Sequence, residues 1–470
     1  MNAMRVLIAA SFILLCVPAA AEPAASNLHL TAHPVGWIAL GLFVAAYAAV
    51  IAEERLRIAK SKPVMLAAAL IWGVLAWWTA TPEGGNAAVR DAFQTMFLEY
   101  SQVFFFLVVA MTYVTAMGER NVFEALRSQL TRRHLSYRQL FWVTGTIAFL
   151  ISPVLDNLTT ALVMSAVILA VCAGNKRFIT LSFINLVVAA NAGGAWSAFG
   201  DITTLMVWQA QKVEFSEFFA IFLPSLINWL IPAIAMSFAV PNGTPHPAEN
   251  PARIKNGGIG ICVTFAVTIL ITVAGRQWLG MPAAYGMLTG LALLNLLATR
   301  IDRSQRGYAL AQGIQGDHGY SIFKIIANAE WDTLLFFYGV FACVGGLAAI
   351  GYLELASTFM YGGFGFTLAN AGMGVLSAVV DNIPIMFAVL KMDPQMDHGQ
   401  WLLITLTAGV GGSLLSIGSA AGVALMGVSR GLYTFNAHLR WSVVIALGYI
   451  ASIAAHLWLN ARFFAPAVAG

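Results

Sequence analysis

Charged side chains are scarce in this sequence of 470 residues, because Asp, Glu, Lys and Arg together make up only 10% of it. A water-soluble globular domain carries about a quarter charged residues, so this chain has too few to cover a surface that faces water. Hydrophobic residues reach 59%, and the mean hydropathy is +0.78. Apolar runs of about 18 residues or more recur, which is the length that a helix needs to cross a hydrocarbon core about 30 Å thick. The composition predicts an all-helical polytopic membrane protein.

Other absences exclude further classes of protein. The four cysteines stand singly in apolar stretches, so we expect no disulfide framework, no resident metal site and no cofactor. No basic block accompanies the net charge of +4, which argues against a nucleic-acid partner. The apolar runs also lack the period-two alternation that the strands of a membrane β-barrel require.

The first residues have the composition of a secretory signal peptide. Arg5 precedes an apolar stretch from Val6 to Val17, and three alanines at 19–21 then precede Glu22. A positive residue, an apolar core and a small-residue cleavage site are typical of such signals. We therefore expect residues 1–21 to be a signal peptide, with an uncleaved first helix as the alternative.

Apolar runs and basic loops together predict the topology. The candidate spans are 35–52, 63–80, 101–117, 218–240, 258–275, 282–299, 333–350 and 441–461. Lys and Arg gather between spans, for example at 55–62 and 120–138, and basic loops tend to stay cytoplasmic. We therefore expect a multi-pass protein of the bacterial inner membrane whose mature N-terminus is periplasmic.

Four further apolar stretches are interrupted by Gly, Pro, Asp or Asn. The basic loops require 139–173 to enter from the cytoplasm and return as a re-entrant hairpin, and 178–209 to cross as a broken helix. In the second half the senses reverse, with a hairpin that includes 370–391 and a broken helix at 401–428. The expected domains are a signal peptide at 1–21, scaffold spans at 22–98, a first repeat at 99–240, linker spans with a cytoplasmic loop at 241–329, and a second repeat at 330–470 whose hairpin covers 352–391.

Three blocks of the first half recur in the second half in the same order. The matched pairs are Glu99-Tyr100-Ser101-Gln102 with Glu330-Trp331-Asp332-Thr333, Ser152–Leu158 with Ser377–Ile383, and Gly193-Gly194 plus Gly200-Asp201 with Gly411-Gly412 plus Gly418-Ser419. Because the predicted membrane senses are opposite, the repeats are expected to be inverted. Inverted repeats place substrate sites near the bilayer midplane between interrupted helices.

Polar side chains gather at the breaks. Backbone at membrane depth must be buried in protein or line a water-filled cavity, so the breaks predict a cavity. The residues that would break the helices are Pro153, Gly193, Gly194, Pro384, Gly411 and Gly412. Four carboxylates lie in otherwise apolar stretches, where an ionised group is costly unless it is paired or coordinated. They are Asp156, Asp201, Asp332 and Asp381, accompanied by Asn157, Thr159, Thr160, Asn191, Thr203, Thr204, Ser377, Asn382, Ser416 and Ser419.

These oxygen-bearing side chains are the ligands that a small hard cation selects. Desolvation raises the pKa of a buried carboxylate, so a metal ion and a proton would compete for the same group. Exchange follows if only the loaded or protonated carrier reorients. Other interpretations stay open: Asp156, Asp332 and Asp381 would cap helices, and Asp201 would be a buried structural hydrogen-bonding group. Glu99 and Glu330 stand at span entrances, where solvated, gating and ion-binding roles are all open.

The blocks resemble the NhaD-type sodium/proton antiporters of the ion-transporter superfamily over nearly the whole chain after residue 21. The matching stretches are SPVLDNLTTAL at 152–162, NAGGAWSAFGDITT at 191–204, EWDTLLFF at 330–337, SAVVDNIP at 377–384 and GGSLLSIGSAAG at 411–422. The resemblance implies exchange of Na⁺ or Li⁺ for H⁺ by alternating access. It also implies a homodimer with a scaffold domain and a mobile, elevator-like transport domain.

By matching position, the resemblance assigns a set of ion-binding or proton-coupling residues, with transported Na⁺ at the two Asp-Asn pairs. The set is Asp156, Asn157, Thr160, Asn191, Asp201, Thr203, Asp332, Ser377, Asp381, Asn382, Ser416 and Ser419.

Two rivals remain. An anion carrier of the same superfamily, for dicarboxylates or oxyanions, would favour neutral tips, helix N-termini or Arg at its site, and the tip aspartates argue against it. An intramembrane hydrolase would need a nucleophile with a base, or a metal cluster. His134, His318 and His438 instead fall in predicted loops, where we expect them to be solvated.

Overall fold

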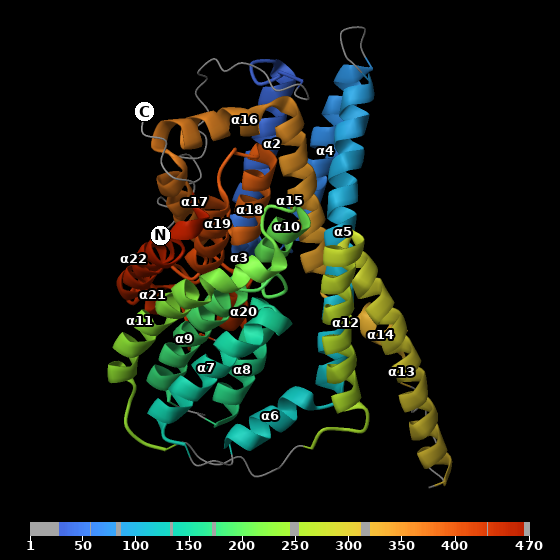
Figure 1. Ribbon diagram of the computed structural model, residues 1–470, viewed down its shortest axis with the longest axis vertical. Helices are drawn as coiled ribbons and strands as arrows, with labels where there is room; N and C mark the ends of the chain where they lie inside the picture. The colour runs from blue at the N-terminus through green and yellow to red at the C-terminus, as the bar shows by residue number, and fades with distance from the viewer. Residues whose placement is uncertain are drawn as a thin grey trace. The chain divides into compact units, whose positions relative to one another are not determined.

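The computed structural model describes residues 28–56, 58–80, 86–131, 135–171, 175–244, 253–311, 320–429 and 431–464 (Figure 1). The signal peptide expected at 1–21 lies outside these residues. The described residues form helices and no strand, which confirms the all-helical prediction. Ten of the helices are long and apolar enough to cross a membrane, judged by length and composition.

The uninterrupted spans begin and end near the predicted positions. They are α2 (Pro34–Ile51), α4 (Ser61–Thr79), α5 (Asn86–Glu119), α11 (Phe222–Ala239), α12 (Gly258–Leu279), α13 (Ala283–Ala311), α15 (Trp331–Ile350) and α22 (Ser442–Leu459). Helix α5 is longer than expected because the more polar residues before 101 continue the same helix. Helix α13 likewise extends beyond its apolar part into a polar segment.

The chain divides into two compact units. Unit 1 comprises residues 1–104, 330–369 and 387–395, and unit 2 comprises 105–329, 370–386 and 396–470. In unit 1, α15 packs against α4, and 78% of the apolar window of α15 is buried. Gly339 permits this approach, since a Cβ there would lie 2.7 Å from a methyl carbon of Val64. The short elements of unit 1 are α3 (Glu53–Leu56), α16 (Tyr352–Ser357) and the π-helix η2 (Thr358–Gly362).

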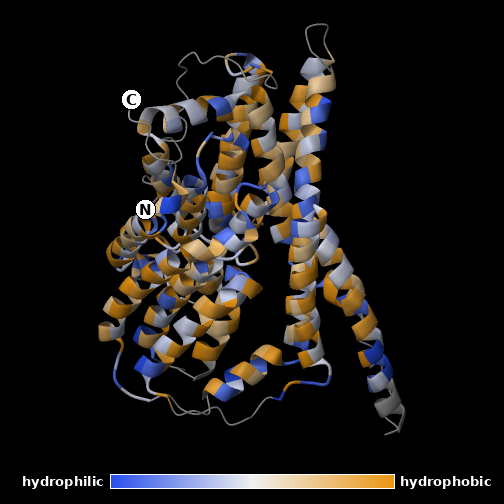
Figure 2. Cartoon of the chain, in the orientation of Figure 1, coloured by the Kyte–Doolittle hydropathy of each residue, from blue (hydrophilic) through white to orange (hydrophobic). Residues whose placement is uncertain are grey.

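Helix α9 (Lys176–Ala195) is the central element of unit 2, with 94% of its apolar window buried. It packs against α7, α8, α11 and α19. Helices α12 and α13 pack against each other, and α12 and the first part of α13 are mainly orange in the hydropathy colouring of Figure 2. The short elements of unit 2 are α6 (Val122–Thr131), η1 (Phe215–Ile221), α14 (Ile322–Ala327), α21 (Phe435–Leu439) and η3 (Ala461–Phe463).

All four interrupted stretches are broken in the structure. The broken pairs are α7 (Tyr137–Leu155) with α8 (Asn157–Val171), α9 with α10 (Ile202–Gln209), α17 (Phe366–Val380) with α18 (Asn382–Met392), and α19 (His398–Gly411) with α20 (Ala420–Val428). Single residues, Asp156 and Asp381, separate the first and third pairs. The glycines and prolines expected to break the helices lie next to these breaks: Pro153, Gly193, Gly194 and Gly411 are in last turns, Pro384 is in a first turn, and Gly412 is a C-cap.

Contacts around the breaks recur in both halves of unit 2. Ser152 Oγ donates to the Ala190 carbonyl (2.6 Å), and Ser377 Oγ donates to the Ala408 carbonyl (3.2 Å). Each serine thus joins α7 or α17 to the broken helix beside it. Matching glycines of the two halves are equally close to neighbouring backbone. A Cβ on Gly193 would lie 2.4 Å from the Phe149 carbonyl oxygen, and a Cβ on Gly411 would lie 2.0 Å from the Gly374 carbonyl oxygen.

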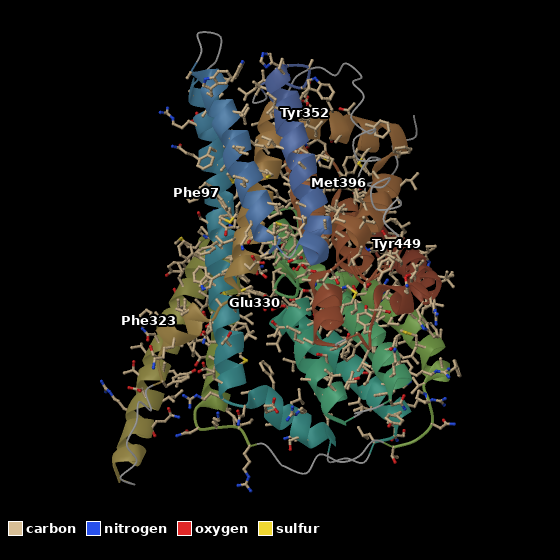
Figure 3. All side chains as sticks on the ribbon, turned by 180° about the vertical axis from the view of Figure 1, so that it is seen from behind. Phe97, Phe323, Glu330, Tyr352, Met396 and Tyr449 are labelled. Carbon is tan, nitrogen blue, oxygen red and sulfur yellow. The ribbon has the colours of Figure 1, made fainter. Side chains whose placement is uncertain are left out.

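Large apolar side chains remain on the outside of several spans. Trp278, Phe238 and Val443 are 81%, 76% and 73% exposed. Such surface is unfavourable in water and favourable in lipid, so the exposed faces agree with a membrane location. Figure 3 shows the side chains on the helices of both units, including the labelled Phe97 of α5 and Tyr352 of α16.

Candidate ion-binding site

The two hairpin tips share an unusual backbone. Asp156 has φ +64° with ψ +161°, and Asp381 has φ +79°; L-residues rarely adopt a positive φ. Each aspartate lies in the one-residue gap between two helices, and the Asn that follows it is the first residue of the next helix. Both Asp-Asn pairs thus combine a positive φ at the Asp with an Asn at the first position of a helix.

Both carboxylates accept hydrogen bonds at the start of the helix that follows. Asp156 Oδ1 accepts from the Thr159 N–H, and its Oδ2 accepts from the Thr159 hydroxyl, both at 2.8 Å. Asp381 Oδ1 accepts from the N–H of Asn382 at 2.8 Å. The hydrogen bond from the Thr159 N–H agrees with the capping interpretation of Asp156, because an N-cap carboxylate accepts from a backbone N–H two or three residues ahead.

Asp201 joins the two tips. This carboxylate is buried at the start of α10, where its Oδ1 accepts from the Thr203 N–H at 3.1 Å. Its Oδ2 accepts from the side-chain amides of Asn157 and Asn382, each at 2.8 Å. One carboxylate oxygen thus holds an amide from each hairpin, and the negative charge of Asp381 also acts on Asp201 through space.

A second chain of amides and hydroxyls links the broken helices. Asn191, in the last two turns of α9, accepts from Asn157 Nδ2 at 3.0 Å and donates to Ser419 Oγ at 3.0 Å. Ser419 caps α20, accepting from the Gly422 N–H. The network Asn157–Asn191–Ser419, together with Asp201 and Asn382, brings the first turns of α8, α10, α18 and α20 to one place.

Two hydroxyls beside this network have no hydrogen-bond partner among the described residues. They are Thr160 Oγ1, one turn beyond Asn157, and Thr203 Oγ1, next to Asp201; both residues are buried. A buried hydroxyl without a partner is costly. Unfilled oxygen acceptors next to carboxylates are what a transported cation would use.

The other predicted residues lie elsewhere in their units. Ser377 fastens α17 to α19 as described, and Ser416 donates to the sulfur of Met426 at 3.3 Å. Asp332 belongs to unit 1, is exposed, and accepts a short hydrogen bond from the Ser61 hydroxyl. It is in the first turn of α15 and is not its N-cap, which is Glu330.

The span-entrance glutamates both have partners. Glu99 forms an ion pair with Lys391 at 2.5 Å within unit 1. Glu330, labelled in Figure 3, accepts from the Thr333 hydroxyl at 3.2 Å and precedes α15.

The prediction that His438 is solvated is wrong. This imidazole is fully buried; it accepts from the Tyr433 hydroxyl (2.7 Å) and donates to the Ser413 carbonyl (2.9 Å), which lies in the break before α20. Burial lowers the pKa of His438, which lies outside the membrane-spanning helices, to about 4, although the carbonyl acts in the opposite direction. The sequence offered no signal for this burial, because α21 has only five residues and is too short to show an amphipathic periodicity.

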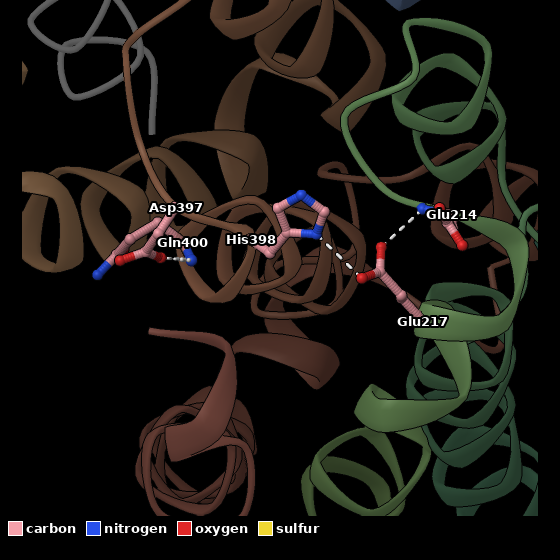
Figure 4. A network of polar contacts seen from close by, with 5 residues as sticks. All are labelled: Glu214, Glu217, Asp397, His398 and Gln400. Atoms are coloured by element: carbon pink, nitrogen blue, oxygen red, sulfur yellow. Dashed lines mark hydrogen bonds and ion pairs between the residues drawn. The ribbon is translucent and has the colours of Figure 1, made fainter. Parts of the chain in front are cut away.

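A further polar group, at the start of α19, was not predicted. His398 contacts Glu217 Oε1 of η1 at 2.9 Å, and Glu217 also accepts from the Glu214 N–H (Figure 4). Beside it, Asp397 caps α19 by accepting from the Gln400 N–H at 2.8 Å. These contacts join η1 to α19 and are separate from the Asp201 network.

The chain is similar to known transporters over most of its length. The family model described as "Citrate transporter" matches residues 47–409. The chain is 51% identical over 473 residues to the "Na(+)/H(+) antiporter NhaD" of Halomonas elongata, covering 98% of this chain and 95% of that protein. It is 48% identical to the protein of the same name from Vibrio cholerae, covering 95% and 96% of the two chains. It is also 32% identical to "Sodium/proton antiporter 1" of Arabidopsis thaliana, covering 90% of this chain and 72% of that one.

Proposed function

The chain belongs to the NhaD family of sodium/proton antiporters, within the group that the citrate-transporter model describes, and we propose that it exchanges Na⁺ or Li⁺ for H⁺ across the bacterial inner membrane. It is a transporter rather than an enzyme. The observation that carries the proposal is the single buried carboxylate, Asp201, that holds one amide from each hairpin tip.

Charge balance at the site favours a cation. Four helix N-termini meet there, each equivalent to roughly +0.5 charge, so their sum is about +2. Without acidic caps such a place would suit an anion. Here Asp156, Asp201 and Asp381 stand at three of the four N-termini. The three ionised carboxylates outweigh the helix dipoles by about one charge, which a monovalent cation or a proton would neutralise.

We infer that Asp201 orients the ligands more than it binds the ion. Both amides turn their NH₂ groups to Asp201 Oδ2, so their Oδ1 atoms face away from it and receive no hydrogen bond from the described residues. These oxygens, the tip carboxylates and the hydroxyls of Thr160 and Thr203 are the ligands that the geometry offers to Na⁺.

The same arrangement supplies a coupling mechanism. A proton on Asp201 Oδ2 would point toward the two amide N–H groups and repel them, because the protonated oxygen becomes a donor at a place where both amides need an acceptor. The amides would then turn, and their Oδ1 atoms would no longer converge on the ion. Na⁺ and the proton would thus exclude one another without sharing an atom.

The repeated contacts within unit 2 support inverted repeats with hairpins and broken helices. Alternating access would proceed by movement of an elevator-like transport domain against a scaffold, in a homodimer whose mature N-termini are periplasmic. These features extend the family membership and the basic-loop pattern to this chain.

Two other functions are less favoured. The citrate-transporter description raises an anion carrier of the same group, yet the three carboxylates at the helix N-termini would repel a carboxylate substrate. A hydrolase is raised by Gly427-Val428-Ser429-Arg430-Gly431, which has the letters of a serine nucleophile motif. The Ser429 hydroxyl, however, donates to the carbonyls of Met426 and Tyr433, so it closes a turn at the end of α20.

Everted membrane vesicles test the proposal. With a pre-formed pH gradient, Na⁺ and Li⁺ are expected to cause fluorescence dequenching, whereas K⁺ and succinate are not. Asp156→Asn and Asp381→Asn are expected to abolish the response while the protein remains in the membrane. A succinate or citrate response with none to Na⁺ would establish the anion carrier instead.

A further inference from the structure

A pocket of about 340 Å³ lies in unit 2, away from the Asp201 network in sequence. Its walls come from the first turn of α9, the end of α11, the turn before α21 and the start of α22. The polar and charged residues in its lining are Lys176, Arg177, Thr180, Thr434 and Arg440, with the Trp441 ring beside them. No carboxylate is among the residues that line it.

The three cations of the pocket are exposed and concentrated on a small area. None of them takes part in an ion pair with another described residue. Three positive charges with no acidic neighbour in the lining repel one another, and an anion would relieve that repulsion. The guanidinium groups of Arg177 and Arg440 each present the forked donors that match phosphate oxygens.

Backbone donors add to this field. Lys176 and Arg177 are the first two residues of α9, a helix of 20 residues, and Asn175 caps only the N–H of Phe178. Helix α22, of 18 residues, begins immediately after Trp441, and no side chain caps it. Two long helices therefore direct the positive ends of their dipoles toward the pocket that holds the three cations.

We propose that this pocket binds a phosphate-bearing anion, and that the phosphodiester headgroup of an acidic phospholipid is its occupant. The stretch 139–173 is predicted to return to the cytoplasm just before Lys176 and Arg177, and basic pockets between membrane helices on that side hold acidic headgroups. Trp441 is an amphipathic ring of the kind found at the headgroup level, and the exposed Val443, two residues further along the chain, would meet an acyl chain.

The occupant would stabilise the junction of the two halves of unit 2. Lys176 and Arg177 begin the broken helix of the first half, whereas Arg440 and Trp441 follow the broken helix of the second. The halves already touch here, because the Thr180 hydroxyl donates to the Leu432 carbonyl at 2.8 Å. A phosphate shared by the three cations would add a second link beside that hydrogen bond.

The test uses the full chain, delipidated in neutral detergent and titrated at constant ionic strength. The ligands are dihexanoylphosphatidylglycerol, dihexanoylphosphatidylcholine and inorganic phosphate, and the readout is the midpoint of thermal unfolding by tryptophan fluorescence. The anionic lipid is expected to raise the midpoint and the zwitterionic lipid is not. Neutralising all three cations with Lys176→Gln, Arg177→Gln and Arg440→Gln should weaken this binding on the order of a hundredfold.

The matched control neutralises three basic residues outside the pocket, with Arg253→Gln, Arg300→Gln and Arg303→Gln, and should keep the full response. Inorganic phosphate that reproduces the shift, and loses it in the pocket variant, would support the site with a free anion as its source. An equal loss in both triple variants, an equal shift with the zwitterionic lipid, or no shift with any ligand would overturn the proposal.

A single substitution covers the case in which the triple variant does not fold. Ala437→Glu places a carboxylate at the pocket wall while all three cations remain, so it should abolish the response to the anionic lipid. Ala437→Gln has nearly the same size without the charge and should retain most of it. Identical behaviour of these two variants would contradict an electrostatic anion site.

Discussion

Asp201→Asn tests the role of the central carboxylate with almost no change in volume. The wild-type side chain accepts three hydrogen bonds, two of them from Asn157 and Asn382 through Oδ2 and one from the Thr203 N–H through Oδ1. An amide has only one acceptor oxygen. Whichever way it turns, its NH₂ group opposes either the two amides or the backbone donor.

The magnitude follows from the hydrogen bonds. A hydrogen bond to a charged group contributes about 1.5–3 kcal/mol. If the loss of one such bond leaves an amide oxygen free to turn away from the ion, Na⁺ affinity should fall roughly 10- to 150-fold, since each factor of ten corresponds to about 1.4 kcal/mol. The free energy of unfolding should change much less than the free energy of Na⁺ binding, because the asparagine still fills the buried volume of the aspartate.

The assay is the Na⁺ concentration that gives half-maximal dequenching in everted vesicles, supported by direct ²²Na⁺ binding to purified protein. Asp91→Asn, an exposed aspartate on α5, is the matched control and should behave as wild type. A double-mutant cycle with Asn382→Ala distinguishes orientation from direct binding. If Asp201 acts through the amides, the second substitution adds little to the first; fully additive losses, or an unchanged affinity in Asp201→Asn, would refute the reasoning.

Three further predictions concern the breaks. Gly411→Ala puts a Cβ 2.0 Å from the Gly374 carbonyl and should lower stability by about 1–3 kcal/mol, whereas Gly372→Ala, with no atom within 4 Å, should lower neither the unfolding midpoint nor transport. Asp381→Gly and Asp381→Ala should both lose transport. The free energy of unfolding of the glycine variant should be about 1 kcal/mol higher than that of the alanine variant, because glycine adopts φ +79° without strain. Equal stabilities of the two variants would count against backbone strain at this position. His438 has a native pKa of about 4, below its unfolded value of about 6.5, so the unfolded state binds the proton first and stability should fall by about 3 kcal/mol as the pH drops from 6.5 to 4. His438→Gln should flatten that part of the stability profile measured by thermal unfolding, and an unchanged slope would show that another group is responsible.

Much of the site could be predicted because its signals are local. The Asp-Asn pairs at 156–157 and 381–382 stand in the repeated blocks and interrupt apolar stretches, so the sequence alone marked both breaks. The hydrogen bond of Ser152 was open to the same logic, because it matches Ser377 in the repeated block, yet only the second serine was named as a site residue. Comparison of the two halves position by position would have found it.

Composition and pattern alone determined the class of protein, its helices, its four breaks and its carboxylate-rich tips, since these depend on near neighbours along the chain and on the length of apolar runs. Only the tertiary structure decided that one oxygen of Asp201 holds an amide from each tip, that His438 is buried under Ser413, and that Asp332 pairs with Ser61. Those contacts join residues up to 271 positions apart. No local preference encodes such pairs, because they depend on how helix faces pack.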